Sequence, residues 1–108
     1  MYVFGGYGAA ADLLLEYRLG SGQWAVLPLA GAPPSARWGH RAVCVRDRML
    51  VLGGCDQIVN YSDMYAYSFA AGAWARVPAR GYPQRFFHAL VATRAGELLA
   101  CGGKNMHN

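Results

Sequence analysis

Two Arg-x-x-His pairs are the residues of this chain best suited to chemistry. Arg37 and His40 stand in RWGHRAVCV, and Arg85 and His88 stand 48 residues later in RFFHALVA. An imidazole can act as a base or a metal ligand near neutral pH, and a guanidinium can bind a carboxylate through two parallel hydrogen bonds. Because one catalytic centre seldom needs the same residue in consecutive repeats, the repetition favours a structural role for both histidines, such as fastening the strand that follows. For both arginines, structural pairing and partner binding stay open.

The other potential metal ligands do not form a recognisable site. The three cysteines, Cys44, Cys55 and Cys101, are odd in number and have no C-x-x-C spacing, which argues against a disulfide framework and a zinc site. We expect them to be buried, reduced thiols in a cytoplasmic protein. His107 does not complete a Tyr/His cluster that would hold copper. The sequence therefore predicts no metal and no cofactor.

The same landmarks recur along the chain at one spacing. An apolar run that ends in Gly-Gly occurs three times, as YVFGG, LVLGG and LLACGG, with steps of 48 and 49 residues. A Tyr and a Trp also recur, each 50 residues apart. A period of this length indicates a repeat architecture. The repeated residues, which we interpret as structural landmarks, are Gly5, Gly6, Gly53, Gly54, Gly102, Gly103, Tyr17, Tyr67, Trp24, Trp74, His40 and His88.

The central repeat predicts four short strands, over residues 39–45, 48–53, 63–69 and 73–77, joined by turns. Four antiparallel strands in about 50 residues form one blade of a β-propeller. We therefore expect an all-β fold with a complete blade over 39–77, flanked by a partial blade over 1–28 (strands two to four) and another over 85–103 (strands one and two). Trp24 and Trp74 are predicted to lie in the core between blades, since each can bury about 150–250 Å².

These motifs resemble the kelch repeat family, which places Gly-Gly at the end of strand two, a Tyr in strand three and a Trp in strand four. MYVFGGYG, DLLLEYRLGSGQW and PPSARWGH are similar to segments of leucine-zipper-like regulator kelch proteins. The resemblance implies that loops between strands two and three, and between blades, gather on one face. The candidate partner-binding residues on that face are Tyr7, Arg37, Asp56, Gln57, Asn60, Arg85 and Asn105.

Composition narrows the function classes. Apolar residues make up 55% and charged residues 15%, which is typical of a packed domain rather than a disordered chain. The net charge of +4 comes from scattered basic residues, so a nucleic-acid surface is not expected, and no apolar run is long enough to span a membrane. We expect a protein-interaction module rather than an enzyme. The resemblance implies a protein partner, including an acidic peptide segment or a ubiquitin ligase substrate; the alternative is part of a galactose-oxidase-like copper oxidase.

The predicted blades are too few to close a ring. Closed propellers contain about 4–8 blades, and this chain offers one complete blade and two partial ones. We therefore expect a fragment whose remaining blades come from missing sequence or from self-association. The isolated chain of 108 residues is predicted to self-associate or to fold poorly.

Overall fold

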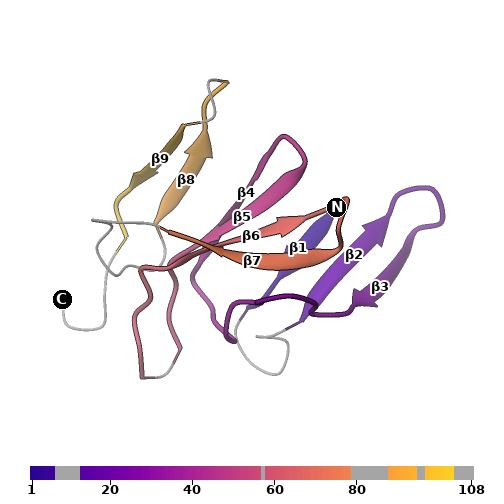
Figure 1. The fold of residues 1–108 in the computed structure, drawn as a ribbon, viewed down its shortest axis with the longest axis horizontal. Coiled ribbons are helices and arrows are strands. Elements are labelled where there is room, and N and C mark those ends of the chain that lie inside the picture. The colour runs from indigo at the N-terminus through magenta and orange to yellow at the C-terminus, as the bar shows by residue number, and fades with distance from the viewer. Residues whose placement is uncertain (7–12, 57, 79–87, 95–96, 104–108) are drawn as a thin grey trace.

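The computed structural model describes residues 1–6, 13–56, 58–78, 88–94 and 97–103. Within them, strands form three antiparallel sheets (Figure 1). The predicted all-β architecture, a four-stranded sheet between two smaller ones, is confirmed. The described residues contain no helix of the length and apolar character needed to cross a membrane. The strands, in chain order, are β1 (Tyr2–Phe4), β2 (Leu14–Arg18), β3 (Gln23–Leu27), β4 (Arg41–Val45), β5 (Arg48–Leu52), β6 (Met64–Ser68), β7 (Ala73–Val77), β8 (Ala89–Ala92) and β9 (Leu98–Cys101).

The two larger sheets repeat one local design. In the first sheet Tyr17 pairs across the strands with Trp24, and in the second Tyr67 pairs with Trp74. The ring centroids of these pairs lie 5.0 and 5.2 Å apart. Aromatic pairs of this kind stabilise neighbouring strands beyond the area they bury. The equal spacing of Tyr and Trp in the two repeats therefore reflects the same hairpin built twice.

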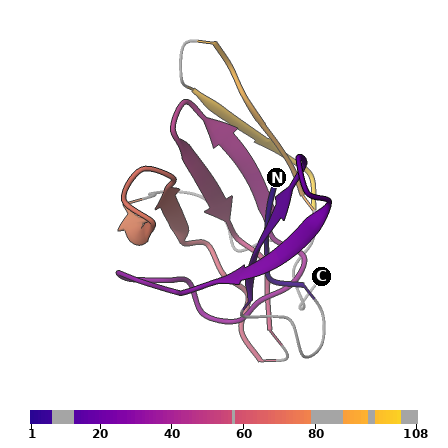
Figure 2. The ribbon, with the colours of Figure 1, turned by 90° about the vertical axis from the view of Figure 1, so that its right-hand side faces the viewer.

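The main core lies between the first two sheets, which Figure 2 shows facing each other. Trp74 of β7 is 3% exposed, and its ring centroid lies 5.1 Å from that of Phe4 in β1. Burying a side chain of this size contributes a gross ~4–6 kcal/mol at about 25 cal/mol/Å². The cluster is therefore the chief apolar contact between the first two repeats. Its buried members are Phe4, Leu14, Met49, Val51, Tyr67 and Trp74.

The segment that joins the first two sheets also pairs with the outer strand of the second. The backbone N–H of Trp74 donates to the Ala30 carbonyl, and the backbone N–H of Ala32 donates to the Trp74 carbonyl, both at 2.9 Å. Gly31 lies between these two bonds with φ +81°, and a Cβ at this position would lie 2.3 Å from the Trp74 carbonyl oxygen. Only glycine allows the two backbones to approach so closely.

Trp24 does not lie in the core that the sequence predicted for it. Its side chain is 53% exposed, and Val26 beside it is 65% exposed. Successive residues of a strand point to opposite faces, so Trp24 and Val26 point away from the face on which Phe4 and Leu14 contact the second sheet. No sheet covers this face among the described residues. The repeat position is therefore a core position only where a neighbouring sheet is present.

The expectation that all three thiols are buried is wrong for two of them. Cys55 is buried, and burial raises the pKa of its thiol. Cys44 in β4 and Cys101 in β9 are exposed. All three are free cysteines.

Candidate functional site

Arg37 forms a buried anchor at the base of the loop over residues 54–62, which joins β5 to β6. Its side chain is 0% exposed and forms a two-point ion pair with Asp63, in which Nη1 donates to Oδ1 and Nη2 donates to Oδ2 at 3.2 Å. Nη1 also donates to the Gly53 carbonyl at 3.1 Å, and Nε donates to the Ser35 carbonyl at 3.1 Å. This arrangement is the structural pairing that the sequence left open. The guanidinium presents no surface to a partner.

Tyr61 connects this anchor to the loop. The Arg37 guanidinium lies 4.0 Å from the centroid of the Tyr61 ring, a cation–π geometry. The Tyr61 hydroxyl donates to Oδ2 of Asp56 at 2.6 Å. Burial, and then the hydrogen bond to Asp56, raises the pKa of Tyr61. The loop therefore closes back on its own base through a buried charge and a short hydrogen bond.

Asp56 fixes the tip of the 54–62 loop. Its Oδ1 accepts hydrogen bonds from the N–H groups of Ile58 and Val59, both at 2.7 Å, and its own N–H donates to the Val59 carbonyl at 3.0 Å. The hydrogen bond from Tyr61, followed by these backbone bonds, lowers the pKa of the Asp56 carboxyl. An ionised aspartate that binds nearby backbone amides is a common way to rigidify a turn.

The base of the loop is packed against the segment before β4. Cys55 exchanges two backbone hydrogen bonds with Trp38, both at 2.9 Å. Gly54 has φ +96°, and a Cβ there would lie 2.9 Å from the Trp38 carbonyl oxygen. Asn60 forms a backbone bridge with Cys55 and is 5% exposed. Asn60 was predicted on the partner face, but in this structure it belongs to the interior of the loop.

Two apolar side chains occupy the exposed tip of the loop. Ile58 is 85% exposed and Val59 is 41% exposed. The sequence prediction concentrated on polar and charged residues and missed both. The signal that could have found them is a pair of β-branched apolar residues inside a connection bounded by Asp56 and Asn60, where neither can belong to a strand of the ladder.

Only part of the predicted partner face can be placed. Tyr7, Gln57, Arg85 and Asn105 lie outside the described residues. The structure brings Arg37 and Asp56 together through Tyr61, and Asn60 lies on the same loop as Asp56. The candidate site is therefore the 54–62 loop and its buried anchor.

His40 links the first two sheets. Its ring lies 5.7 Å from the Phe4 ring of β1, centroid to centroid. Its Nδ1 atom is buried with no hydrogen-bond partner among the described residues. Burial lowers the pKa of His40 to about 4, against an opposing contribution from the Phe4 backbone; Arg37, Arg41 and His88 lower it further. His88, at the equivalent position before β8, is also buried.

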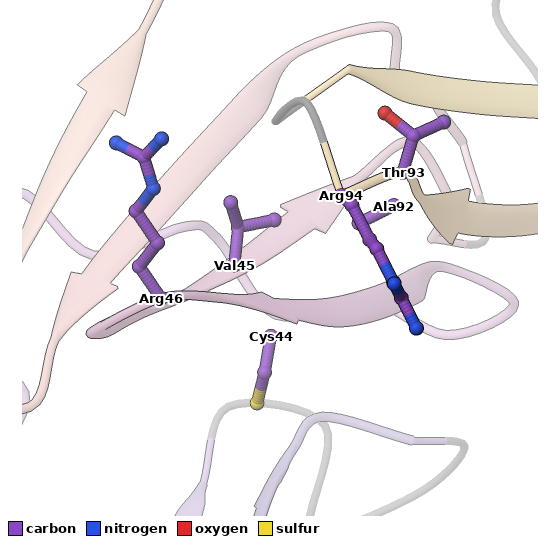
Figure 3. Close-up of a pocket in the computed structure, with 6 residues that line it drawn as sticks. All are labelled: Cys44, Val45, Arg46, Ala92, Thr93 and Arg94. Carbon is purple, nitrogen blue, oxygen red and sulfur yellow. The ribbon is translucent and has the colours of Figure 1, made fainter.

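A second concave feature lies at the opposite edge of the sheets. A cavity of about 260 Å³ opens between the β4–β5 and β8–β9 hairpins (Figure 3). In Figures 1 and 2 the β4–β5 turn and the end of β8 lie at the edge away from the connection between β5 and β6. The residues that line the cavity are Cys44, Val45, Arg46, Ala92, Thr93 and Arg94. In the part of the chain that the structure describes, no group of three or more His, Cys, Asp or Glu side chains could hold a metal ion.

The fold and the loops together define the class of protein. Antiparallel sheets of one repeated design, packed face to face and joined by short connections, are blades of a β-propeller. The KLHDC2/KLHL20/DRC7 Kelch-repeats domain matches residues 1–108. The chain belongs to the kelch repeat family, and its described residues form one four-stranded sheet and two smaller sheets, which is a partial kelch propeller.

Several known proteins are similar to this chain at low identity. Kelch domain-containing protein 3 of Bos taurus is 25% identical over 98 residues, which are 88% of this chain and 26% of that protein. Host cell factor 2 of Homo sapiens is 33% identical over 72 residues, 67% of this chain and 8% of that protein. A protein of Thlaspi arvense named N-(sulfonatooxy)prop-2-enimidothioate sulfolyase is 27% identical over 101 residues, 85% of this chain and 29% of that protein. The chain thus spans less than a third of the length of each of these relatives.

Proposed function

We propose that this chain is a protein-interaction module in which the tip of the 54–62 loop contacts the partner. Membership of the kelch repeat family supports the general role of a protein-interaction propeller. The observation that carries the specific proposal is the contrast between a fixed base and an exposed apolar tip. Arg37 is buried at the base, and Ile58 is 85% exposed at the tip.

The hydrogen bonds of Asp56 make this tip suitable for binding. A loop that is already ordered loses less conformational entropy when a partner immobilises it, so more of the contact energy appears as affinity. An exposed β-branched residue on such a loop can enter an apolar pocket of a partner, as the central residues of interfaces commonly do. The proposed partner therefore presents an apolar depression that accepts Ile58.

The wider setting of the interaction is also part of the proposal. The partner is a protein held for a larger assembly, such as a substrate of a ubiquitin ligase, in the cytoplasm. An acidic segment of that partner would have to meet cations other than Arg37, because Asp63 already neutralises the Arg37 guanidinium. Arginines that are exposed at the surface of the sheets remain available to bind such an acidic segment.

A site-specific photo-crosslinker tests the loop in the whole protein. It is placed at Ile58 and, in a matched control, at Leu19, which is 82% exposed at the β2–β3 turn on another hairpin. We expect one partner protein to be crosslinked from position 58 and not from position 19. The Ile58→Asp variant should abolish co-purification of that partner, while Leu19→Asp should leave it intact. Equal crosslinking from both positions would overturn the proposal.

A kelch-fold enzyme is the alternative. One similar protein carries the name of a sulfolyase, and kelch-fold copper oxidases were the enzyme class that the sequence left open. Among the described residues no group of three or more His, Cys, Asp or Glu side chains could hold a metal ion. Membership of the kelch repeat family supports the interaction proposal. Metal analysis and an oxidase assay of the full-length protein separate the two, since stoichiometric copper with oxidase activity would overturn the interaction role.

A further inference from the structure

We propose that the cavity between the β4–β5 and β8–β9 hairpins binds an oxyanion, a phosphate or carboxylate group, through Arg46, Arg94 and Thr93. This site is separate from the 54–62 loop, which lies at the opposite edge of the sheets (Figures 1 and 2). The cavity has about 260 Å³, enough for a small anion and part of the molecule that carries it.

The chemistry of the cavity wall favours an anion. Two arginines and one threonine belong to the lining, and no aspartate or glutamate does. Thr93 Oγ1 accepts a hydrogen bond from the Glu97 N–H at 3.1 Å, which leaves the hydroxyl hydrogen for a ligand oxygen. Val45 and Ala92 are the apolar residues of the lining. Hydrogen bonds from cations to oxyanions are among the stronger polar contacts in proteins.

The site arises because two consecutive blades place the same kind of residue at the same point. Arg46 and Arg94 are 48 residues apart, which is the repeat spacing, and each follows the first strand of its blade. β4 and β8 lie beside each other, so the residues that end them meet at one edge. A single blade would supply only one of the two cations.

The backbone at Arg46 supplies an independent observation. Arg46 has φ 57°, and it is the one non-glycine residue with positive φ among those that the structure describes. Glycine, asparagine or aspartate is favoured in that conformation, and other residues are less stable there. A residue that lines a cavity and keeps an unfavourable backbone conformation there is the pattern expected of a binding residue.

The two guanidinium groups do not point toward each other in this structure. In Figure 3 the Arg94 side chain extends to the same side of the hairpin as Cys44, whereas Arg46 extends to the other side. Both residues are exposed, so their side chains can change rotamer without disturbing the core. Binding is therefore expected to draw at least one of them over the cavity.

Cys44 gives a local readout, because it lines the cavity and its thiol is exposed. The rate of its alkylation by iodoacetamide is measured by peptide mass spectrometry during titration with inorganic phosphate at constant ionic strength. Because only the unliganded form reacts, phosphate at about ten times its Kd should slow Cys44 alkylation about tenfold. Cys101, also exposed but outside the lining, is the internal control and should be unaffected.

Variants separate binding from folding. Arg94→Gln and Arg46→Gly should each abolish the phosphate protection of Cys44, and Arg46→Gly should leave the fold at least as stable because glycine tolerates positive φ. Arg48→Gln is the matched control, since Arg48 is exposed on the same hairpin but does not line the cavity. Protection that survives both cavity variants, or that Arg48→Gln removes equally, would overturn the site.

A parallel titration with acetate identifies the ligand group. Saturable protection by phosphate alone assigns a phosphate-bearing ligand, protection by acetate alone assigns a carboxylate-bearing one, and protection by both shows that the site accepts either oxyanion. If neither anion slows Cys44 alkylation relative to Cys101, the cavity is not an oxyanion site.

Discussion

Trp24 and Trp74 occupy the same position in successive repeats, yet one is 53% exposed and the other 3% exposed. Each stands in the last strand of its sheet, opposite a tyrosine, with nearly the same ring geometry. The difference lies outside the sheet. Phe4 of the preceding blade covers Trp74, whereas no described residue of a preceding blade covers Trp24. The contribution of a repeat residue to stability is therefore set by its neighbour.

The largest effect that this comparison predicts is the loss of the Trp74 side chain. Trp74→Ala should lower the free energy of unfolding by about 3–5 kcal/mol, because it leaves a cavity between two blades. Trp24→Ala should lower it by less than about 1 kcal/mol, because the ring is half exposed in the single chain. Urea denaturation of the two variants measures the difference.

A second copy of the chain would remove the difference between Trp24 and Trp74 if it covered the first sheet. If self-association covers the first sheet, Trp24→Ala should reduce the mass seen in light scattering, and its effect on stability should approach that of Trp74→Ala. A stable, cooperatively melting monomer would contradict the expectation of self-association.

The two ion pairs offer a parallel comparison. The side chains of Arg37 and Asp63 are 0% and 16% exposed, while those of Arg18 and Glu16 are 59% and 23% exposed. Asp63→Asn should cost about 3 kcal/mol because it leaves a buried guanidinium without its counter-charge. Glu16→Gln should cost less than about 1 kcal/mol. Equal losses in thermal unfolding would show that the Arg37 charge is not desolvated in solution.

Two glycines with positive φ show in the same way that the cost of a substitution depends on the neighbouring residues. Gly31→Ala should destabilise the chain by about 2–3 kcal/mol, because the new Cβ would meet the Trp74 backbone as well as strain φ. At Gly22 the nearest atom to a new Cβ is the Tyr17 hydroxyl at 3.7 Å, so Gly22→Ala should cost about 1 kcal/mol from φ alone. Chemical denaturation distinguishes these values.

The last prediction depends on pH and again concerns the contact between blades. The pKa of His40 is about 4 in the fold and 6.5 when unperturbed, so the unfolded chain binds the proton more readily between these values. Stability should be full above about pH 7 and fall as pH drops towards 4, by about 2 kcal/mol at pH 5. The His40→Gln variant should show a shallower decline over this window. An unchanged slope would mean that other groups account for the acid sensitivity.

The sequence was sufficient to predict the strands, because the repeat spacing records which residues must pair within a sheet. It was also sufficient to place Trp74 in the core. It could not predict that Trp24 is exposed, because that depends on whether another sheet lies against its face. The repeat contains information about a blade and none about which blades are present.

The candidate site was predicted less well for a different reason. The sequence left open whether Arg37 pairs inside the fold or binds a partner, because its burial depends on Asp63, which lies 26 residues away. A signal was available, because an Asp precedes the third strand in two repeats, at Asp12 and Asp63, as an Arg precedes the first. The exposure of Ile58 could not be predicted, because it follows from the specific hydrogen bonds of Asp56.

The segment around Gly31 has a consequence for solubility. β7 ends the second sheet, and the unpaired backbone groups of such an edge can recruit strands from other molecules. The two hydrogen bonds that Trp74 makes with Ala30 and Ala32 occupy part of this edge. The connection from one blade therefore shields the outer edge of the next from aggregation. A cleavage, insertion or domain boundary placed between Leu27 and Gly39 would remove these hydrogen bonds from the edge of β7. The second sheet would then be exposed to aggregation although none of its own residues had changed.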